Sequence, residues 1–555
     1  MLKKHTKLKK ETGRWLVLVA VAIPLIAISI DNTVLDLALP SIADDMQASA
    51  LQLQWVINAY TLAAATPLLV IGALADKVGR KRMMLIGLAI FGIASLLAVL
   101  STNMGMLITA RIILGLGGAM MLPSTLSIVR ATFTTPKELM LAIAVWSGIM
   151  GAGNAVGPII GGVLLEFFSW HSVFLLNLPF VLLGAWTVHI WVKESRGENA
   201  PWPDFIGTVL STGTLFAIVY GVIKAGEAGW SSPITWLFIS IGLVMGTIFV
   251  WVENKSSNPM VPFVVFKNRS FASACMGMTI MSLAMMGSLF FISQYLQSIQ
   301  GNSPLIAAVM MLPLVPFMLI ATSLAPILAR KIGVKWVLVA GLVFAIAGLF
   351  YYSWVVAVNS PYWQMLTTMA LVSIGLGLAF SMSSNAIMGS LPSSRAGAGS
   401  ALNETSQQIG GAFGVAILGA IMNSTYRADV TGIPFWNMLA DDLKNAIMSS
   451  VQNAHITAAE HLSNEEGAIV LQYANQAFVN GMNYAMLIGA FIAVVALIVI
   501  IIFMPRNIHY AKEGMNTEEA IKEAAMEANA EKDNAAQQIA SSYQLIINIA
   551  QTNTS

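Results

Sequence analysis

The chain has few residues that could form cross-links or hold a metal ion. It contains one cysteine, Cys275, in 555 residues, which excludes an internal disulfide and any metal site built from several cysteines. Its six histidines are scattered and show no metal-ligand spacing. We therefore expect neither a metal centre nor a bound cofactor.

Charge is also scarce. Only 10% of the residues are charged, the formal net charge is +2, and no Lys/Arg cluster is interleaved with aromatic residues. This composition gives no support for a nucleic-acid partner. The phosphate-binding pattern G-x-x-x-x-G-K-[ST] is absent as well, so an ATP-driven pump is not expected.

Apolar sequence dominates instead. Hydrophobic residues make up 57% of the chain and the mean hydropathy is +0.74, which indicates an integral membrane protein. The first apolar run is too long for a signal-peptide core, so we expect it to be retained. Fourteen segments are long enough to cross a hydrocarbon core of ~30 Å: 15–38, 53–74, 83–101, 105–128, 139–164, 171–192, 205–225, 233–252, 272–297, 305–328, 336–357, 362–386, 397–422 and 481–504.

Basic residues predict the orientation of these spans. Because fourteen is an even number, both termini lie on one side of the membrane. Twenty-five of the 29 Lys and Arg residues fall on the terminal segments and on the connections of that side. Three (Lys224, Arg427 and Lys444) fall on the other side, and Arg111 lies within a span. The positive-inside rule therefore predicts cytoplasmic termini.

A short repeat indicates two related halves. LADKVGRK (74–81) follows the second span, and LARKIGVK (328–335) follows the tenth, at an offset of 254 residues. Both copies fall on predicted cytoplasmic connections between equivalent spans. Two related halves that rock about a site at the midplane are the usual build of a secondary transporter.

The first copy belongs to a charged loop, GALADKVGRKRMML (72–85). A basic cytoplasmic turn is one explanation. The spacing G-x-L-A-D-x-x-G-R-K is more specific, because it resembles the loop signature of the major facilitator superfamily. The resemblance implies that Asp76 and Arg80 hold the two halves in one facing state by charged contacts. The second copy has Arg330 where Asp76 stands, so only the first can make an acidic contact. The implied gating residues of the loop are Gly72, Asp76, Gly79, Arg80 and Lys81.

The fourth span, LITARIILGLGGAMMLP, contains Arg111 alone among apolar residues. An arginine inside a bilayer needs a partner or water, so we favour a functional residue over a snorkelling structural one. The segment resembles the fourth-helix motif of the same superfamily, with Leu114 in place of the usual glutamine.

The fifth span contains GAGNAVGPIIGG (151–162). Gly153, Gly157 and Gly161 fall on one helix face and would let another helix approach closely, while Pro158 withdraws a backbone donor and allows a bend. A plain packing seam is the alternative. The complete string, which ends at Gly162, is similar to the motif that marks exporters in the superfamily, and it implies a gating role for these five residues.

Further segments extend the resemblance over about residues 14–505. IDNTVLDLALP, SWHSVFLLNLP, QYLQSIQGNSP and ALNETSQQIGGAFGVAILGAI look like the fourteen-span drug:proton antiporter branch, which includes quaternary-ammonium and antiseptic exporters. The resemblance implies an all-α major facilitator fold in a bacterial inner membrane. The implied parts are a basic N-terminus (1–14), a six-helix bundle (15–192), two extra spans (205–252), a second six-helix bundle (272–504) and a cytoplasmic tail (505–555).

The second bundle carries an insertion between its last two spans, at residues 425–480. Leu439, Leu443, Ile447 and Val451 form a helical pattern, and a second helix is predicted from Asn464 to Phe478. We favour an external helical hairpin over a disordered loop.

Exchange of cations against protons needs carboxylates in a low-dielectric cavity, and the spans offer only Asp31, Asp36 and Glu404. Counting from the span ends places Asp31 about 25 Å from the cytoplasmic edge and Arg111 about 9 Å from the external surface, at similar levels. We hypothesise that Asp31 and Arg111 interact and that a proton or a cation breaks the pair. Glu404 lies roughly 10 Å in from the cytoplasmic side. It matches an acidic position of the family, which implies a role in substrate binding or proton coupling; we favour this role over that of a buried glutamate that only bonds its neighbours.

Asp36 stands where relatives often carry asparagine, and it is either an addition to the outer vestibule or a solvated boundary residue. Aromatic faces for a lipophilic cation could come from several side chains, of which Tyr60 and Trp146 are the candidates; ordinary packing is the alternative for each. We predict a monomeric transporter, not an enzyme, with small lipophilic cations, protons and membrane lipid as partners. Export of one specific metabolite or self-made antibiotic by the same fold is the second hypothesis.

Overall fold

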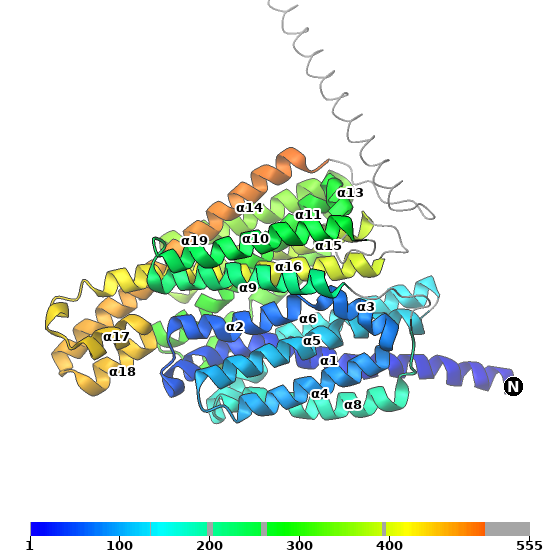
Figure 1. Cartoon of the computed structure of the whole chain (residues 1–555), viewed down its shortest axis with the longest axis horizontal. Helices are drawn as coiled ribbons and strands as arrows, with labels where there is room; N and C mark the ends of the chain where they lie inside the picture. The colour runs from blue at the N-terminus through cyan, green and yellow to red at the C-terminus, as the bar shows by residue number, and fades with distance from the viewer. Residues whose placement is uncertain (1, 134, 197–203, 257–262, 391–395, 506–555) are drawn as a thin grey trace, which may run out of the picture.

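The computed structural model describes the whole chain except residues 1, 134, 197–203, 257–262, 391–395 and 506–555 (Figure 1). Its regular secondary structure is helical throughout the described residues. The helices are α1 (Leu2–Met46), α2 (Ala50–Ala65), α3 (Leu68–Val78), α4 (Arg80–Val99), α5 (Met104–Thr132), α6 (Pro136–Phe167), α7 (His171–Leu175), α8 (Asn177–Trp191), α9 (Phe205–Ala228), α10 (Pro233–Lys255), α11 (Arg269–Gln294), α12 (Pro304–Met311), α13 (Leu314–Ile332), α14 (Val334–Val355), α15 (Tyr362–Gly389), α16 (Ala396–Val430), α17 (Asp441–Ser449), α18 (Val451–His461) and α19 (Asn464–Phe503).

Thirteen helical segments of the described chain are long and apolar enough to cross a membrane. The pair α2–α3 makes a fourteenth when its two parts, which meet at 51°, count as one span. Pro67 lies at the break, where its missing N–H and its ring interrupt the helix. When the α2–α3 pair is counted as one span, the predicted all-α membrane protein of fourteen spans is confirmed.

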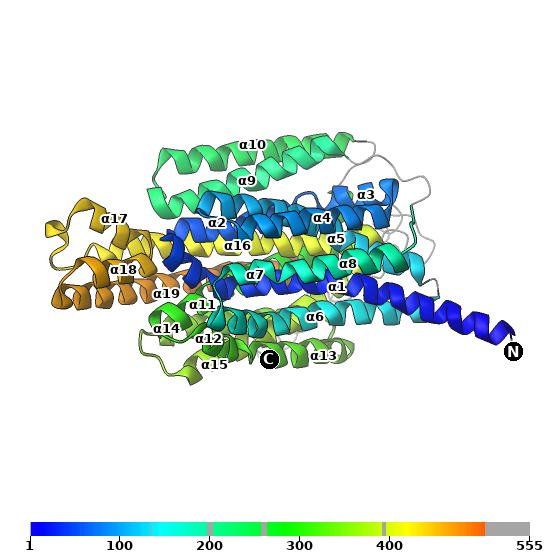
Figure 2. The ribbon, with the colours of Figure 1, turned by 90° about the horizontal axis from the view of Figure 1, so that it is seen from below.

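The spans form two bundles. Helices α1 to α8 pack with one another, and helices α11 to α16 pack together with α19 (Figures 1 and 2). Helices α9 and α10 form an antiparallel pair outside these bundles, and α9 lies against α16 and α2. The architecture is therefore two six-span bundles plus two additional helices.

The sequence repeat forms the same turn in both bundles. Gly79 separates α3 from α4 with a φ of 127°, and Gly333 separates α13 from α14 with a φ of 88°. The amide of each glycine donates to a carbonyl four residues earlier, which closes the preceding helix. Glycine is required at both positions because a Cβ disfavours this backbone region.

Helix α1 continues beyond the predicted first span, 15–38, and past Pro40, and finishes at Met46. Pro40 cannot donate a hydrogen bond to the carbonyl of Asp36, four residues earlier. The hydroxyl of Ser293 in α11 donates to that carbonyl instead, at 2.6 Å. A proline that frees a carbonyl inside one bundle is thus compensated by a side chain of the other bundle.

The insertion before the last span differs from the predicted hairpin. Helices α17 and α18 are present, but the predicted helix at 464–478 is the first part of α19, which runs unbroken to Phe503. A capping box between Ser463 and Glu466 starts α19, and no proline interrupts it. The proposed tail at 505–555 lies almost entirely outside the described residues.

The two bundles meet through hydrogen bonds at one end of the molecule, which we call the α17–α18 end (Figure 1). Besides the Ser293 bond, Gln297 donates to the carbonyl of Leu37 at 3.1 Å. Asn453 of α18 donates to the carbonyl of Gln47, at the end of α1, at 3.2 Å. The interface between the bundles is therefore closed at this end.

Candidate functional site

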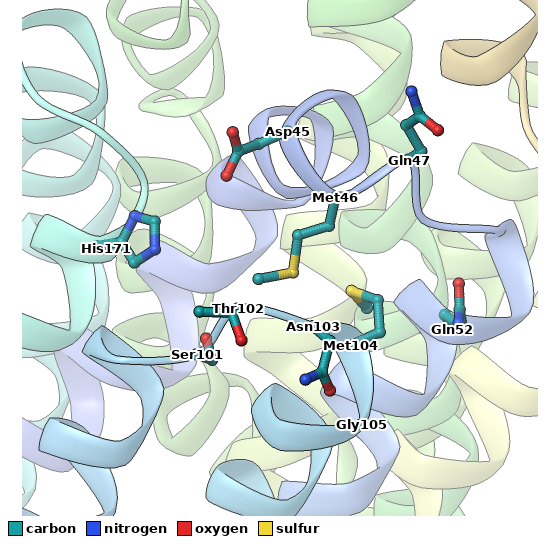
Figure 3. A pocket seen from close by; sticks show the side chains of 10 residues that line it. All are labelled: Asp45, Met46, Gln47, Gln52, Ser101, Thr102, Asn103, Met104, Gly105 and His171. Atoms are coloured by element: carbon teal, nitrogen blue, oxygen red, sulfur yellow. The ribbon is translucent and has the colours of Figure 1, made fainter.

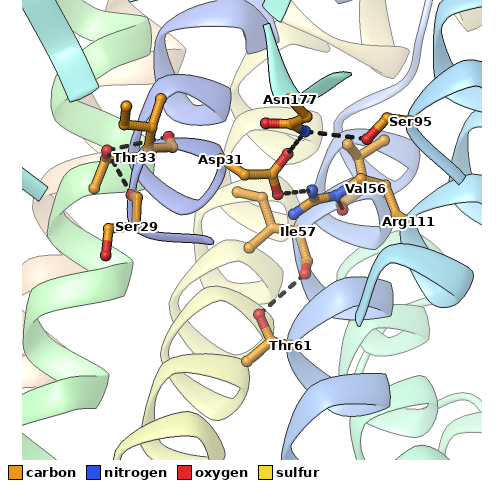
Figure 4. Close-up of polar contacts among 10 residues, drawn as sticks. Ser29, Asp31, Thr33, Val56, Ile57, Thr61, Ser95, Arg111 and Asn177 are labelled. Carbon is orange, nitrogen blue, oxygen red and sulfur yellow. Dashed lines mark hydrogen bonds and ion pairs between the residues drawn. The ribbon is translucent and has the colours of Figure 1, made fainter. Parts of the chain in front are cut away.

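A buried ion pair lies inside the first bundle (Figure 4). Nη1 of Arg111 in α5 donates to Oδ2 of Asp31 in α1 at 2.7 Å, and the two side chains are 2% and 0% exposed. The contact predicted from helix depth is confirmed. Its role in proton coupling stays a prediction.

Helix α2 holds the other side of the arginine. Nε of Arg111 donates to the carbonyl of Val56 at 3.1 Å, and the guanidinium carbon lies 4.2 Å from the ring centroid of Tyr60. Gly115 and Gly118 of α5 make room for this approach. A Cβ added at Gly115 would lie 2.5 Å from the carbonyl oxygen of Tyr60, and a Cβ added at Gly118 would lie 3.0 Å from the Tyr60 hydroxyl. Tyr60 therefore contacts the predicted arginine rather than an open surface.

Asn177, at the start of α8, completes the coordination of the aspartate. Its amide donates to Oδ1 of Asp31 at 2.8 Å and to the hydroxyl of Ser95 in α4 at 3.3 Å. Sequence reasoning did not single out Asn177 or Ser95. The signal was available for Asn177, because an amide in the apolar run SWHSVFLLNLP needs a partner in the bilayer.

Two donors, Nη1 of Arg111 and the amide of Asn177, satisfy the carboxylate of Asp31, whose charge balances that of the guanidinium. Removing one partner of a buried ion pair leaves an uncompensated charge, which is why such pairs respond strongly to protonation. A proton on Asp31 would replace a charge-assisted bond by a weaker one and weaken its hold on the guanidinium. The site is suited to a switch between two charge states rather than to covalent chemistry.

Asp36 lies further along α1, towards the α17–α18 end. Its side chain is 8% exposed, which does not fit a solvated boundary residue. The side chain has no hydrogen bond among those found in the described residues, and Arg111 is the cation within electrostatic range. Asp36 is therefore a second buried carboxylate, at the junction of the two bundles.

Glu404 lies in α16 of the second bundle and is half-buried. Nε2 of Gln408 donates to its carboxylate at 3.1 Å. Glu404 is within electrostatic range of Tyr60, so it is on the side of α16 that faces the first bundle. The buried oxygens of its neighbours Asn403 and Thr405 find no hydrogen-bond partner among the described residues.

The glycines of α6 serve two different contacts. At Gly153 and Gly161 an added Cβ would lie 2.6 Å from Ser29 and Val34 of α1, and at Gly157 it would collide with Thr33. At Gly162 it would lie 2.8 Å from Ala308 in α12, which belongs to the other bundle. The first three therefore form a seam within the bundle, and only Gly162 packs across the interface.

The charged loop is tied to its own bundle. Nε of Arg80 donates to Asp76 at 2.8 Å, and the carboxylate of Glu194 accepts from the backbone amides of Lys81 and Arg82 at 3.1 and 3.2 Å. Lys81 donates to a carbonyl near the end of α8. The ion pairs found among the described residues do not include the expected contact of this loop with the other bundle. Gly72 lies against Pro123 of α5 at ordinary distance.

Two further features lie apart from this cluster. Trp146 of α6 donates its indole N–H to Thr125 of α5 at 3.0 Å. A surface cavity of about 740 Å³ opens at the α17–α18 end of the first bundle (Figure 3), and none of the predicted site residues lines it. Its lining residues are Asp45, Met46, Gln47, Gln52, Ser101, Thr102, Asn103, Met104, Gly105 and His171.

Comparison with known proteins gives consistent matches over most of the chain. The sequence profile of the Major Facilitator Superfamily matches residues 21–415. "Multidrug efflux pump LfrA" of Mycolicibacterium smegmatis is 35% identical over 88% of this chain and 96% of its own length. "Tetracenomycin C resistance and export protein" of Streptomyces glaucescens is 31% identical, covering 89% and 92%. "Methyl viologen resistance protein SmvA" of Salmonella typhimurium is 31% identical, covering 84% and 93%.

A solved structure shows the same fold at low identity. A bacterial homologue of the human lysosomal transporter Spinster superposes with a TM-score of 0.58 at 18% identity. The match covers 88% of this chain and 98% of that protein. This likeness supports the fold and carries no information on substrate.

Proposed function

The chain belongs to the major facilitator superfamily, a family of membrane transporters rather than enzymes, and from this premise we propose that it exports small lipophilic cations in exchange for protons. The observation that carries the proposal is the buried pair of Asp31 and Arg111, which can be opened by a proton or by a competing cation. The names of its relatives, which include a multidrug efflux pump and a methyl viologen resistance protein, support small drugs as cargo. The transport needs no bound cofactor because the proton gradient drives it.

The proposed orientation places both termini in the cytoplasm of a bacterial inner membrane and the α17–α18 end outside. The distribution of Lys and Arg supports it. The closed α17–α18 end then corresponds to a state that faces the cytoplasm. The chain works as a monomer with 15–192 and 272–504 as the moving bundles and 205–252 as the additional pair.

The proposed cycle uses three acids. A cation from the cytoplasm is held by Glu404, whose side of α16 faces the first bundle. Protonation from outside neutralises Asp31 and weakens its ion pair with Arg111. Asp36 lies between this pair and the closed end and takes part in release. The loop of Asp76 and Arg80 acts as a hinge, and the glycines of α6 form the seam along which α6 packs against α1.

The proton supplies enough free energy for such export. One charge that moves down ~100 mV releases about 2.3 kcal/mol. This corresponds to a substrate gradient of the order of fiftyfold for one proton per cation. A pH gradient adds to it.

A narrower function is the second candidate. The tetracenomycin C resistance and export protein matches 89% of this chain at 31% identity, and its name gives one specific compound. Export of a single compound through the same site is therefore the second candidate. The two candidates differ in the number of unrelated cations that the chain carries.

Inside-out vesicles distinguish these candidates. In energised vesicles with an acidic lumen, tetraphenylphosphonium, ethidium and a quaternary ammonium antiseptic should each release lumenal protons, measured by the recovery of a quenched pH dye. Vesicles with the Asp31→Asn variant are the matched control and should give no release. Absence of release with all three compounds in the parent would overturn the multidrug proposal; release with only one would favour the narrower function.

A further inference from the structure

Two amide side chains of α2 are buried without satisfied hydrogen bonds. Asn58 is 0% exposed, and neither its Oδ1 nor its Nδ2 has a partner among the described residues. Gln54, one turn earlier, is 1% exposed, and its Oε1 has no partner either. Residues four apart share one helix face, so the two amides form one polar strip.

This strip faces the second bundle. An added Cβ at Gly419 of α16 would lie 2.7 Å from the Cδ of Gln54, so the glycine admits the amide against the α16 backbone. Leu62, one turn beyond Asn58 on the same face, packs in an apolar cluster with Val222 of α9 and Ala416 of α16. The two amides are therefore enclosed between α2, α9 and α16 by apolar side chains.

Such an arrangement is unfavourable in the state described. Each buried polar group without a partner costs about 1–3 kcal/mol, and folded proteins pair nearly all of them. Leucine at either position would avoid this cost. The amides are therefore explained by a second state in which this face is open to water or to a ligand.

The transport cycle requires that state. Helices α2 and α16 belong to different bundles, and Gln54 lies in the first turns of α2, close to the α17–α18 end that is closed here. Alternating access parts the bundles at this end, so the contact between Gln54 and Gly419 must break. The amide strip then lines the opened path.

Aromatic rings lie beside the strip. The ring centroid of Trp55 lies 5.6 Å from that of Phe216 and 5.9 Å from that of Tyr220, both in α9. Amide oxygens accept polarised hydrogens of an organic cation, and the faces of Trp and Tyr attract its charge. This combination fits a lipophilic cation better than a neutral or anionic ligand.

We propose that Gln54 and Asn58 form an exit subsite that binds the exported cation in the outward-open state. The inference rests on the proposed function and adds a site to it, in a part of the interface that none of the predicted site residues occupies. It also assigns α9, one of the two additional helices, a share in substrate contact.

Cysteine accessibility tests the opening of this face. The only native cysteine, Cys275, is buried and is replaced in a Cys275→Ser parent. The labelling rate of Asn58→Cys and Gln54→Cys by a membrane-impermeant maleimide is measured in cells. Labelling should be at least tenfold faster during turnover than without a proton gradient. Tetraphenylphosphonium should slow it. Gln47→Cys, at an exposed position, is the positive control, and Leu88→Cys, which is 0% exposed in α4, is the negative control.

Transport kinetics test the ligand contact. Asn58→Leu and Gln54→Leu should raise the KM for tetraphenylphosphonium about fivefold or more at unchanged protein level, whereas a purely structural role would leave the KM unchanged. The proposal is overturned if Gln47→Cys is labelled and neither amide position is, or if both leucine variants keep the parental KM. Export by the Cys275→Ser parent reports the proposed function separately: if the parent exports and these tests fail, only the exit subsite is refuted. If the parent does not export, the transport proposal fails.

Discussion

Removing one partner of the Asp31–Arg111 pair should cost far more stability than removing both. In Asp31→Asn the guanidinium of Arg111 keeps the Val56 carbonyl and the Tyr60 ring, but it loses its carboxylate at 2.7 Å in a site that is nearly inaccessible to water. In Arg111→Met the carboxylate keeps only the amide of Asn177. Each single variant therefore leaves a buried, uncompensated charge.

The expected magnitude follows from this burial. Breaking a buried pair by removal of one partner costs about 3–5 kcal/mol, whereas replacing both partners by neutral groups of similar volume is often close to neutral. The double variant Asp31→Asn/Arg111→Met should thus be more stable than either single variant. The coupling in the double-mutant cycle should be of the order of 3 kcal/mol and opposite in sign to the single losses.

Reversible unfolding in mixed micelles measures the cycle, and vesicle transport accompanies it. The double variant should regain most of the free energy of unfolding without regaining proton-coupled export, because stability and switching depend on different properties of the pair. Asp36→Asn is the matched control: it replaces a second buried carboxylate of α1 without breaking an ion pair, so it should not reproduce the loss of stability of Asp31→Asn. Additive losses in the double variant would refute the reasoning, as would export with parental pH dependence in Asp31→Asn.

Three further predictions follow from close contacts and from charge. Gly153→Ala should destabilise the protein by about 1–3 kcal/mol, since the new Cβ would lie 2.6 Å from Ser29, while Gly151→Ala, with nothing within 4 Å, should be neutral; equal thermal stabilities would contradict the close α1–α6 seam. Gly79→Ala should cost more than Gly229→Ala in thermal unfolding, because both have positive φ but only Gly79 also meets the Glu194 carboxylate, at 2.6 Å; equal losses would show that Glu194 is not held there. Glu404→Gln should raise the KM for a lipophilic cation about tenfold, or roughly 1.4 kcal/mol, and leave that for a neutral substrate unchanged; loss of both to the same extent would remove Glu404 from cation recognition.

The sequence predicted the spans well because the bilayer imposes a strict length and polarity on each of them. It failed where the helices continue outside that constraint. The predicted first span ends at residue 38, but α1 continues through Pro40, because the Ser293 hydroxyl satisfies the carbonyl that the proline leaves free. The prediction separates the start of α19 from the last span because hydropathy falls before residue 481, while helical propensity does not.

The candidate site was predictable only in part. Asp31 and Arg111 could be paired from depth along two helices, because a rise of 1.5 Å per residue fixes level in the membrane. The depth of a residue in the membrane does not determine the direction in which its side chain points around the helix axis. The same calculation therefore could not identify Asn177 or assign Asp36 to the junction with α11. The amides of Gln54 and Asn58 could not be predicted for a related reason. In the sequence they are ordinary polar residues near a helix start, and only the packing against α16 shows that they are enclosed.

Helix α1 connects the buried ion pair of the proposed mechanism with the interface between the two bundles. Asp31 binds Arg111 on one side of the helix, and five residues later the backbone carbonyl of Asp36, left free by Pro40, binds Ser293 of the other bundle. A helix is stiff over such a distance, so a displacement that follows release of Arg111 reaches the Asp36 carbonyl almost undiminished. Loss of the Ser293 bond would then weaken the closed end next to the amide strip of α2. With alanine at position 40 the Asp36 carbonyl would accept a hydrogen bond within α1, and we expect the Ser293 bond between the bundles to weaken.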